Sequence, residues 1–240
     1  MFNKKNNLRK KIFSIGKKIT DSPLTLIELE RNSKRRTEQA KEELIKGFAF
    51  INTYQKSVTF FGSARFDENH PSYQKARDVA RRISHEGFAV VTGGGPGIME
   101  AANRGALEGD GEKNSLGICI KLPKEQNTNP YVRSFVDFNF FFTRKVILTF
   151  SAEAYIYFPG GFGTLDEFFE IVTLIQTNKI EKVPIILVGN DYWKPFDEFI
   201  KKMLCEKYNV INENDTNIYT ITEDEEEIIE IIKNAPLRRE

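Results

Sequence analysis

From residue 57 onward, short apolar runs alternate with amphipathic helical segments, and this alternation is the strongest constraint on the fold. Strands that alternate with helices form βαβ units, in which the strands are parallel and the helices cover the sheet. We therefore expect an α/β fold: a Rossmann-like doubly wound parallel sheet with helices on both faces. The runs that read as strands are 58–61, 88–91, 116–120, 154–158, 184–188 and 218–221.

Helical periodicity fills the intervals between these runs. Apolar residues recur three or four positions apart, which places them on one face of each predicted helix. One aromatic-rich segment, 135–142, carries no pattern that decides between helix and strand. The segments predicted as helices are 71–86, 98–107, 143–150, 165–175, 195–208 and 223–233.

Residues 1–56 precede this core and read as a basic tail followed by a helical extension. Apolar residues between 21 and 55 fall at helical spacings among Glu, Lys and Arg. The first twenty residues hold seven Lys or Arg, and no acidic residue occurs before Asp21. Such a segment is either a polyanion-binding arm or a solvated tail, and the tail is the preferred interpretation. The chain thus divides into the extension, 1–56, and a Rossmann-like domain, 57–240.

Charge and cysteine content limit the classes of partner. The 240 residues carry 35 Lys and Arg against 34 Asp and Glu, a net charge of +1, so no global field favours nucleic acid or an anionic membrane. No apolar window of about 18 residues is present, and no secretory signal follows the basic start. Cys119 and Cys205 lie far apart, and His70 and His85 share no ligand-like spacing with them. We expect a cytoplasmic protein with no metal, no nucleic-acid partner and no membrane partner.

Two glycine-rich turns each leave a strand and open a helix. They are 92–97, Thr-Gly-Gly-Gly-Pro-Gly, and 159–164, Pro-Gly-Gly-Phe-Gly-Thr. This geometry points several backbone N–H groups and a helix dipole at one place, which makes an anion site. In a doubly wound sheet both turns lie at the carboxyl ends of strands, so they can converge on one phosphate-bearing ligand. The simpler interpretation, that each is only a tight turn, is less favoured because there are two.

Neither turn matches a dinucleotide or triphosphate motif. Reading G-x-G-x-x-G from Gly93 places Ile98 at the last position, and reading it from Gly161 places Asp166 there. The G-x-x-x-x-G-K-[S/T] sequence of P-loop enzymes does not occur in the chain. The sequence therefore predicts a site of monophosphate size.

Acidic side chains follow the second turn immediately. Asp166, Glu167 and Glu170 occupy the first turns of the helix, where a bound phosphate would repel them. Their presence favours a role towards a developing positive charge or a sugar hydroxyl. The alternative is structural, because Thr164-x-x-Glu167 fits a capping box. The Arg-Lys pair at 144–145 is either an exposed basic pair or a source of compensating positive charge.

Three stretches together resemble the Lonely Guy (LOG) family of cytokinin-activating phosphoribohydrolases, which are often called lysine decarboxylases. They are Arg-Lys at 144–145, Pro-Gly-Gly-Phe-Gly-Thr-x-x-Glu at 159–167, and Gly-Gly-Gly-Pro-Gly-Ile-Met at 93–99. The resemblance spans about residues 57–189. It implies hydrolysis of the N-glycosidic bond of a nucleoside 5′-monophosphate, of the AMP or N6-modified AMP type, to free base and ribose 5-phosphate. It also implies no cofactor, and a homodimer or higher homo-oligomer whose sites are completed at the subunit interface.

The same resemblance implies which residues form the site. Arg144 and Glu167 fall on the catalytic positions: Glu167 would stabilise an oxocarbenium-like sugar, orient hydroxyls or position water, and Arg144 would act as an electrostatic clamp. Two departures, Glu100 after Met99 and the long extension 1–56, leave the identity of the base open. The residues implied in substrate binding are Gly94, Gly95, Gly97, Glu125, Lys145, Gly160, Gly161, Gly163, Thr164 and Thr173.

Two other classes of function compete with this hydrolase. A non-catalytic nucleotide sensor or carrier would keep the anion site, and loss of Arg144 or Glu167 would have favoured it, but both residues are present. A PLP-dependent decarboxylase needs a Schiff-base lysine beside a phosphate site, and no lysine has that context. The expected partner is therefore a nucleoside 5′-monophosphate substrate.

Overall fold

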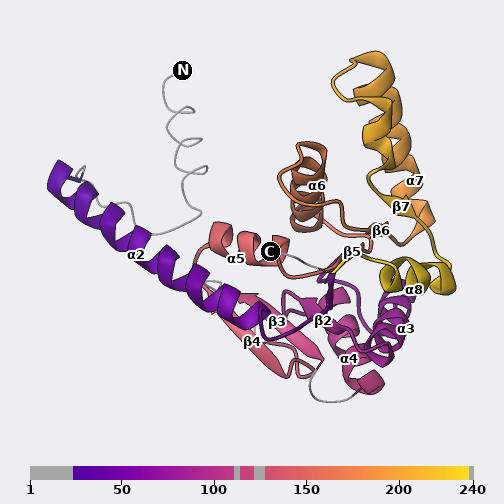
Figure 1. Ribbon diagram of the computed structural model, residues 1–240, viewed down its shortest axis with the longest axis horizontal. Helices are drawn as coiled ribbons and strands as arrows, with labels where there is room; N and C mark the ends of the chain where they lie inside the picture. The colour runs from indigo at the N-terminus through magenta and orange to yellow at the C-terminus, as the bar shows by residue number, and fades with distance from the viewer. Residues whose placement is uncertain (1–23, 111–113, 122–127, 238–240) are drawn as a thin grey trace, which may run out of the picture. The chain divides into compact units, whose positions relative to one another are not determined.

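A parallel sheet forms the centre of the structure, a computed structural model that describes residues 24–110, 114–121 and 128–237. Its seven strands lie in the order β4-β3-β2-β1-β5-β6-β7, and each neighbouring pair is parallel. The predicted doubly wound α/β sheet is therefore confirmed (Figure 1). The strands are β1 (Ser57–Phe61), β2 (Ala89–Thr92), β3 (Ser115–Ile120), β4 (Ser134–Phe138), β5 (Ala154–Tyr157), β6 (Ile185–Leu187) and β7 (Thr220–Ile221).

Helices cover both faces of the sheet, and each face has its own apolar core. Buried residues of α3, α4 and α8 form one core with the sheet, and those of α5, α6, α7 and the end of α2 form the other. The central strand β1 is buried along its whole length, as expected for a strand covered on both sides. The helices are α2 (Leu26–Ile51), α3 (Pro71–His85), α4 (Ile98–Asp110), α5 (Phe141–Thr149), α6 (Phe162–Gln176), α7 (Asn190–Phe199), a π-helix (Ile200–Lys207), a 3₁₀ helix (Glu213–Asn217) and α8 (Glu225–Lys233).

The structure also assigns segments that the sequence pattern left open or placed differently. Residues 134–138, in the undecided aromatic region, form the edge strand β4 beside β3. Helix α6 begins at Phe162, three residues earlier than predicted, because Gly161 in an extended conformation is already its N-cap. The single helix predicted at 195–208 is α7 followed by the π-helix. It starts early because Gly189, with φ of 118°, turns the chain directly from β6 into α7.

Contacts within the chain divide it after Gln39, so the second half of α2 belongs to the compact unit that contains the sheet. A side chain at Gly47 would collide with Ile147 of α5 and Phe138 of β4, so this half of α2 lies closely against both elements. The predicted division after residue 56 stays a prediction. The basic segment predicted as a solvated tail lies outside the described residues.

The first half of α2 is held by local contacts. The backbone N–H of Thr25 donates to the Glu28 carboxylate at 2.8 Å, and the Glu28 N–H donates back to the Thr25 hydroxyl at 3.3 Å, which is the pairing of a capping box. Lys34 pairs with Glu30 one turn earlier at 2.8 Å. Within the described ranges, no helix has the length and apolar character needed to cross a membrane.

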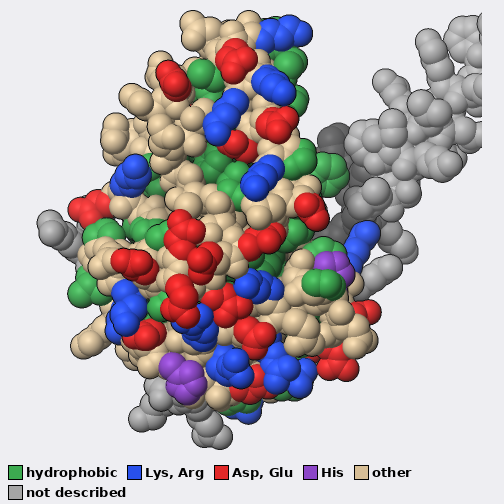
Figure 2. Space-filling view, turned by 90° about the vertical axis from the view of Figure 1, so that its right-hand side faces the viewer, with side chains coloured by type: hydrophobic (Ala, Val, Ile, Leu, Met, Phe, Trp, Pro, Cys, Tyr) green, Lys and Arg blue, Asp and Glu red, His purple; other side chains and the backbone are tan. Residues whose placement is uncertain are grey.

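The surface that carries α3, α4 and α8 has acidic and basic side chains interspersed (Figure 2). Several of them form ion pairs between helices: Lys75 of α3 lies 2.7 Å from Glu225 of α8, and Arg77 of α3 lies 2.6 Å from Glu108 of α4. This face therefore shows the balance that the net charge of +1 indicates for the chain.

The strand order reverses between β1 and β5. From β1 the chain proceeds outward to β4 on one side, and from β5 it proceeds to β7 on the other. At such a reversal the connections leave the two central strands towards opposite faces, which opens a crevice at their carboxyl ends. The fold therefore presents the turns that follow β1 and β5 at the position where doubly wound sheets bind ligands.

Candidate active site

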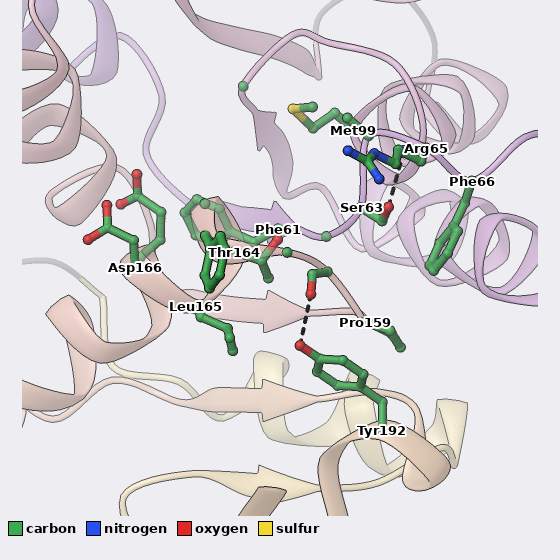
Figure 3. Close-up of a pocket in the computed structure, with 18 of the residues that line it drawn as sticks. Phe61, Ser63, Arg65, Phe66, Met99, Pro159, Thr164, Leu165, Asp166 and Tyr192 are labelled. Atoms are coloured by element: carbon green, nitrogen blue, oxygen red, sulfur yellow. Dashed lines mark hydrogen bonds between the residues drawn. The ribbon is translucent and has the colours of Figure 1, made fainter. Parts of the chain in front are cut away.

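A cavity of about 880 Å³ lies at this reversal (Figure 3). Its walls come from the turns after β1, β2 and β5, from the starts of α4, α5 and α6, and from one side chain of α7. A volume of this order accommodates a small organic ligand. Both glycine turns were predicted to reach one cavity. The whole turn after β5 lines it, whereas the turn after β2 contributes only Gly93 among its glycines.

The turn after β5 forms the N-terminus of α6 and one wall of the cavity. A Cβ atom at Gly161 or Gly163 would meet no protein atom within 4 Å, so these two backbone positions border open space. A Cβ at Gly160 would collide with the Thr164 side chain, so glycine is required there for packing. The wall therefore exposes backbone at the positive end of a helix dipole, which is the arrangement that binds phosphate.

Tyr192 of α7 holds this turn from the other side. Its hydroxyl donates a hydrogen bond to the carbonyl oxygen of Gly160 at 2.8 Å (Figure 3). The bond fixes the orientation of the Gly160 peptide group. The neighbouring Trp193 donates its indole N–H to the Tyr157 carbonyl at 3.1 Å, which anchors the same part of α7 to the end of β5.

Glu167 lies in the second turn of α6, with 7% of its surface exposed. Burial raises the pKa of its carboxyl to about 7, against the opposing effect of the Arg144 and Lys145 charges. The capping-box alternative is wrong, because Gly161 is the N-cap and Thr164 lies inside the helix. A buried carboxyl with a raised pKa in a cavity is typical of a group that takes part in catalysis.

Arg144 of α5 lines the same cavity. Its Nε–H donates to the Ile118 carbonyl of β3 at 2.9 Å, which fixes the side chain. A Cβ at Gly93 would collide with the Arg144 guanidinium, so the glycine leaves the space that this side chain occupies. Burial lowers the pKa of Arg144, and the nearby charge of Glu167 raises it. The predicted catalytic pair is therefore brought together from two helices and interacts electrostatically across the cavity.

Lys145 and Thr173 occupy positions outside the cavity wall. The Lys145 ammonium lies 2.9 Å from the Asp166 carboxylate and 3.1 Å from that of Glu170, so it ties α5 to α6. Thr173 is exposed, further along α6. Glu125 lies outside the described residues. Direct binding of substrate by these three residues stays a prediction.

The remaining glycines of the turn after β2 shape the wall rather than line it. The Gly94 N–H donates to the Thr92 hydroxyl at 2.9 Å, and the carbonyls of Gly94 and Gly95 accept from Asn129. Gly97 has φ of 72°, and a Cβ there would collide with the backbone of the turn after β1. Their predicted role as substrate ligands also stays a prediction.

The sequence analysis did not predict two parts of the cavity wall. The first is the turn after β1, residues 62–66, which includes Arg65. The Gly62-Ser63 pair directly after the first strand was the available signal, because ligands bind at the carboxyl ends of central strands. The second is Tyr192, whose position depends on how α7 packs, and no local sequence signal indicates that.

The chain is similar to proteins of a known family. Residues 99–232 match the family described as "Possible lysine decarboxylase". The pyrimidine/purine nucleotide 5′-monophosphate nucleosidase of Escherichia coli (strain K12) is 30% identical over 161 residues, which are 62% of this chain and 35% of that protein. The cytokinin riboside 5′-monophosphate phosphoribohydrolase LOG of Oryza sativa subsp. japonica is 30% identical over 162 residues, or 65% of this chain and 64% of the rice protein. The chain thus spans about a third of the bacterial relative's length.

A solved structure also shares the fold. The molybdenum cofactor binding protein from the phototrophic bacterium Rippkaea orientalis superposes with a TM-score of 0.51 and 25% identity, covering 74% of this chain and 93% of the other. This chain is therefore similar both to proteins named as hydrolases and to a protein named for binding.

Proposed function

We propose that this chain, which belongs to the LOG family, also described as possible lysine decarboxylases, hydrolyses the N-glycosidic bond of nucleoside 5′-monophosphates. The observation that carries the proposal is the presence of Glu167, Arg144 and an anion-binding helix terminus in one cavity. Relatives named as nucleosidase and phosphoribohydrolase support the same reaction class.

The geometry supports a division of roles. The phosphate binds at the N-terminus of α6, where Gly161 and Gly163 leave room for it. Glu167 lies one turn further along the same helix, so the ribose C1′ of a bound nucleotide comes near its carboxylate. Water forms a bond to C1′ and gives up one proton while the bond from C1′ to the base nitrogen breaks, and the departing base takes up one proton.

Glu167 and Arg144 act on the charges that develop in this step. The transition state carries positive charge on the sugar, which a buried carboxylate stabilises strongly because water does not screen it. Arg144 stays cationic near neutral pH, so it holds phosphate, sugar or departing base electrostatically and does not serve as a general acid.

A PLP-dependent decarboxylase fits the cavity poorly. That reaction needs a lysine amine that forms a Schiff base beside the cofactor phosphate. Among the described residues that line the cavity there is no lysine. Lys145 of α5 does not line the cavity, and its ammonium group is paired with the carboxylates of Asp166 and Glu170.

A carrier that binds without hydrolysis is the second candidate, because the Rippkaea orientalis protein with the same fold is named for cofactor binding. The cavity then binds its ligand and releases it unchanged. The retention of Glu167 beside a phosphate site favours the hydrolase, since a carboxylate repels a phosphate and gives a carrier no benefit.

We also propose that a second copy of the chain covers the rim of the cavity. Phe162 and Phe141 both line it, and they are 94% and 60% exposed in the single chain. Large exposed apolar side chains around a site are typical of a surface that another protein covers. Sedimentation of the purified protein tests this, and a monomer at micromolar concentration contradicts it.

Base release from a panel of purine and pyrimidine nucleoside 5′-monophosphates, followed by chromatography, tests the function. We expect release by the wild type and a loss of at least about 100-fold in Glu167→Gln and in Arg144→Ala. Glu198→Gln and Arg81→Ala are matched controls, because both side chains are exposed and neither lines the cavity. Release that survives both site substitutions places the chemistry elsewhere, and binding without release supports the carrier.

A further inference from the structure

Arg65 has no role in the reaction described above, yet it lines the cavity. We propose that Arg65 binds the phosphate of the ligand from the side opposite the N-terminus of α6. The inference rests on the proposed function only for the class of ligand, a nucleoside 5′-monophosphate. It adds a phosphate-binding side chain from the turn after β1.

The backbone around Arg65 is fixed to both glycine turns. The Ser63 N–H donates to the Pro159 carbonyl at 3.0 Å, which joins the turns after β1 and β5. The Ser63 carbonyl accepts from the Ile98 N–H at 3.0 Å, which joins the same turn to the start of α4. The Arg65 N–H donates to the Ser63 hydroxyl at 3.1 Å. These hydrogen bonds fix the backbone from which the Arg65 side chain extends, so its starting position beside the cavity is defined.

The side chain itself remains available to a ligand. Figure 3 shows the Arg65 guanidinium beside Met99 and Ser63, on the other side of the view from Thr164 and Asp166. The residue is exposed, and it forms no ion pair with any described residue. A planar guanidinium with several donors matches the oxygens of a phosphate group.

The charges in the cavity also require a further cation. The charged side chains among the described lining residues are Arg65, Arg144, Asp166 and Glu167. Asp166 is paired with Lys145, and Arg144 interacts with Glu167. A phosphate monoester brings about −1.5 to −2 charges at neutral pH, whereas a helix N-terminus offers about +0.5. Arg65 is the lining cation that is left to balance the difference.

Two probes separate phosphate binding from other roles. Ribose 5-phosphate carries the phosphate and the sugar without a base, and adenosine carries the base and the sugar without a phosphate. Titration calorimetry is performed with the wild type, Arg65→Ala, Arg65→Lys and the exposed control Arg81→Ala. Because charged hydrogen bonds are lost, we expect Arg65→Ala to weaken ribose 5-phosphate binding by about 10- to 100-fold. Arg65→Lys recovers part of the loss, and adenosine binding does not change.

The outcomes are distinct from those of the hydrolysis assay. If Arg65→Ala weakens ribose 5-phosphate and adenosine equally, or weakens neither, the proposal is wrong. It is also wrong if the wild type does not bind ribose 5-phosphate. If ribose 5-phosphate binding depends on Arg65 but AMP is not hydrolysed, the inference stands and the proposed hydrolase fails. If AMP is hydrolysed with the same KM by the wild type and Arg65→Ala, the hydrolase stands and the inference fails.

Discussion

The Glu43 carboxylate accepts two hydrogen bonds from Asn139, one from its backbone N–H and one from its side-chain amide, each 2.8 Å long. The same carboxylate accepts from the Thr143 hydroxyl and from the Phe140 N–H. Phe140 is the N-cap of α5, and its apolar side chain makes no capping hydrogen bond. A buried glutamate of α2 thus fixes the backbone that leads into the helix that carries Arg144.

Replacement of this glutamate is expected to destabilise the protein. Glu43→Gln loses charge-assisted hydrogen bonds in a buried position, and we expect a loss of about 1–3 kcal/mol in the free energy of unfolding at pH 7. Burial raises the pKa of Glu43, but its hydrogen bonds outweigh this, and the net pKa lies below the ordinary value of 4.5. The stabilisation is therefore complete above about pH 4.5 and is lost as the pH falls through the lower, folded-state pKa.

Urea unfolding at pH 7 and at pH 3 to 4 measures this difference, with the exposed Glu42→Gln as the control. The difference in the free energy of unfolding between wild type and Glu43→Gln is expected to be smaller at pH 3 to 4 than at pH 7. A gap that stays constant over this range contradicts the assignment of the effect to the Glu43 charge.

The pH dependence of base release provides a second prediction. Because the pKa of Glu167 is raised to about 7, its carboxylate is half protonated near neutral pH. If the ionised form stabilises the sugar cation, kcat/KM rises with pH through about 7 and approaches a plateau above about 8. The substrate phosphate ionises near pH 6, so its own step lies lower. A profile that falls between pH 6 and 8 would show that the protonated carboxyl is the active form.

The same carboxyl is expected to cost stability. Its folded-state pKa of about 7 exceeds the ordinary 4.5, so the fold loses stability as the pH rises from about 4.5 to about 7. Glu167→Gln removes this cost and is expected to stabilise the protein at pH 8 by up to about 3 kcal/mol, although it lowers base release by at least about 100-fold. Thermal unfolding at pH 8 and pH 5 tests this, since the advantage is predicted to shrink at pH 5. A variant that is less stable at both values contradicts it.

Two glycine substitutions are expected to have opposite effects on fold and binding. A Cβ at Gly163 meets no protein atom, so Gly163→Ala keeps the stability and weakens nucleotide binding by about 10-fold or more, because the methyl group enters the phosphate space. Gly97→Ala combines a φ of 72° with a collision against backbone, so we expect a loss of about 2 kcal/mol or more in stability. Calorimetric unfolding together with AMP titration compares them. Equal loss of stability in both variants would refute the contrast.

The sequence predicted the elements that local pattern controls. Hydrophobic periodicity located the central strands and the helices between them, because burial on both faces imposes a continuous apolar run on each central strand. The glycine motif at 159–164 and the nearby Glu167 were also visible in the sequence, because a helix N-terminus that exposes its backbone needs glycine at fixed positions.

Only the tertiary structure decided which residues surround the cavity. Glu43 reaches Asn139 across 96 positions of the chain, and Tyr192 reaches Gly160 across 32, and no local pattern records such contacts. Tertiary packing also directed Lys145 towards Asp166 and Glu170, and it brought Arg65 into the cavity wall. Sequence spacing controls the local hydrogen bonds and the burial of one element, whereas the meeting of separate elements depends on the order of strands in the sheet.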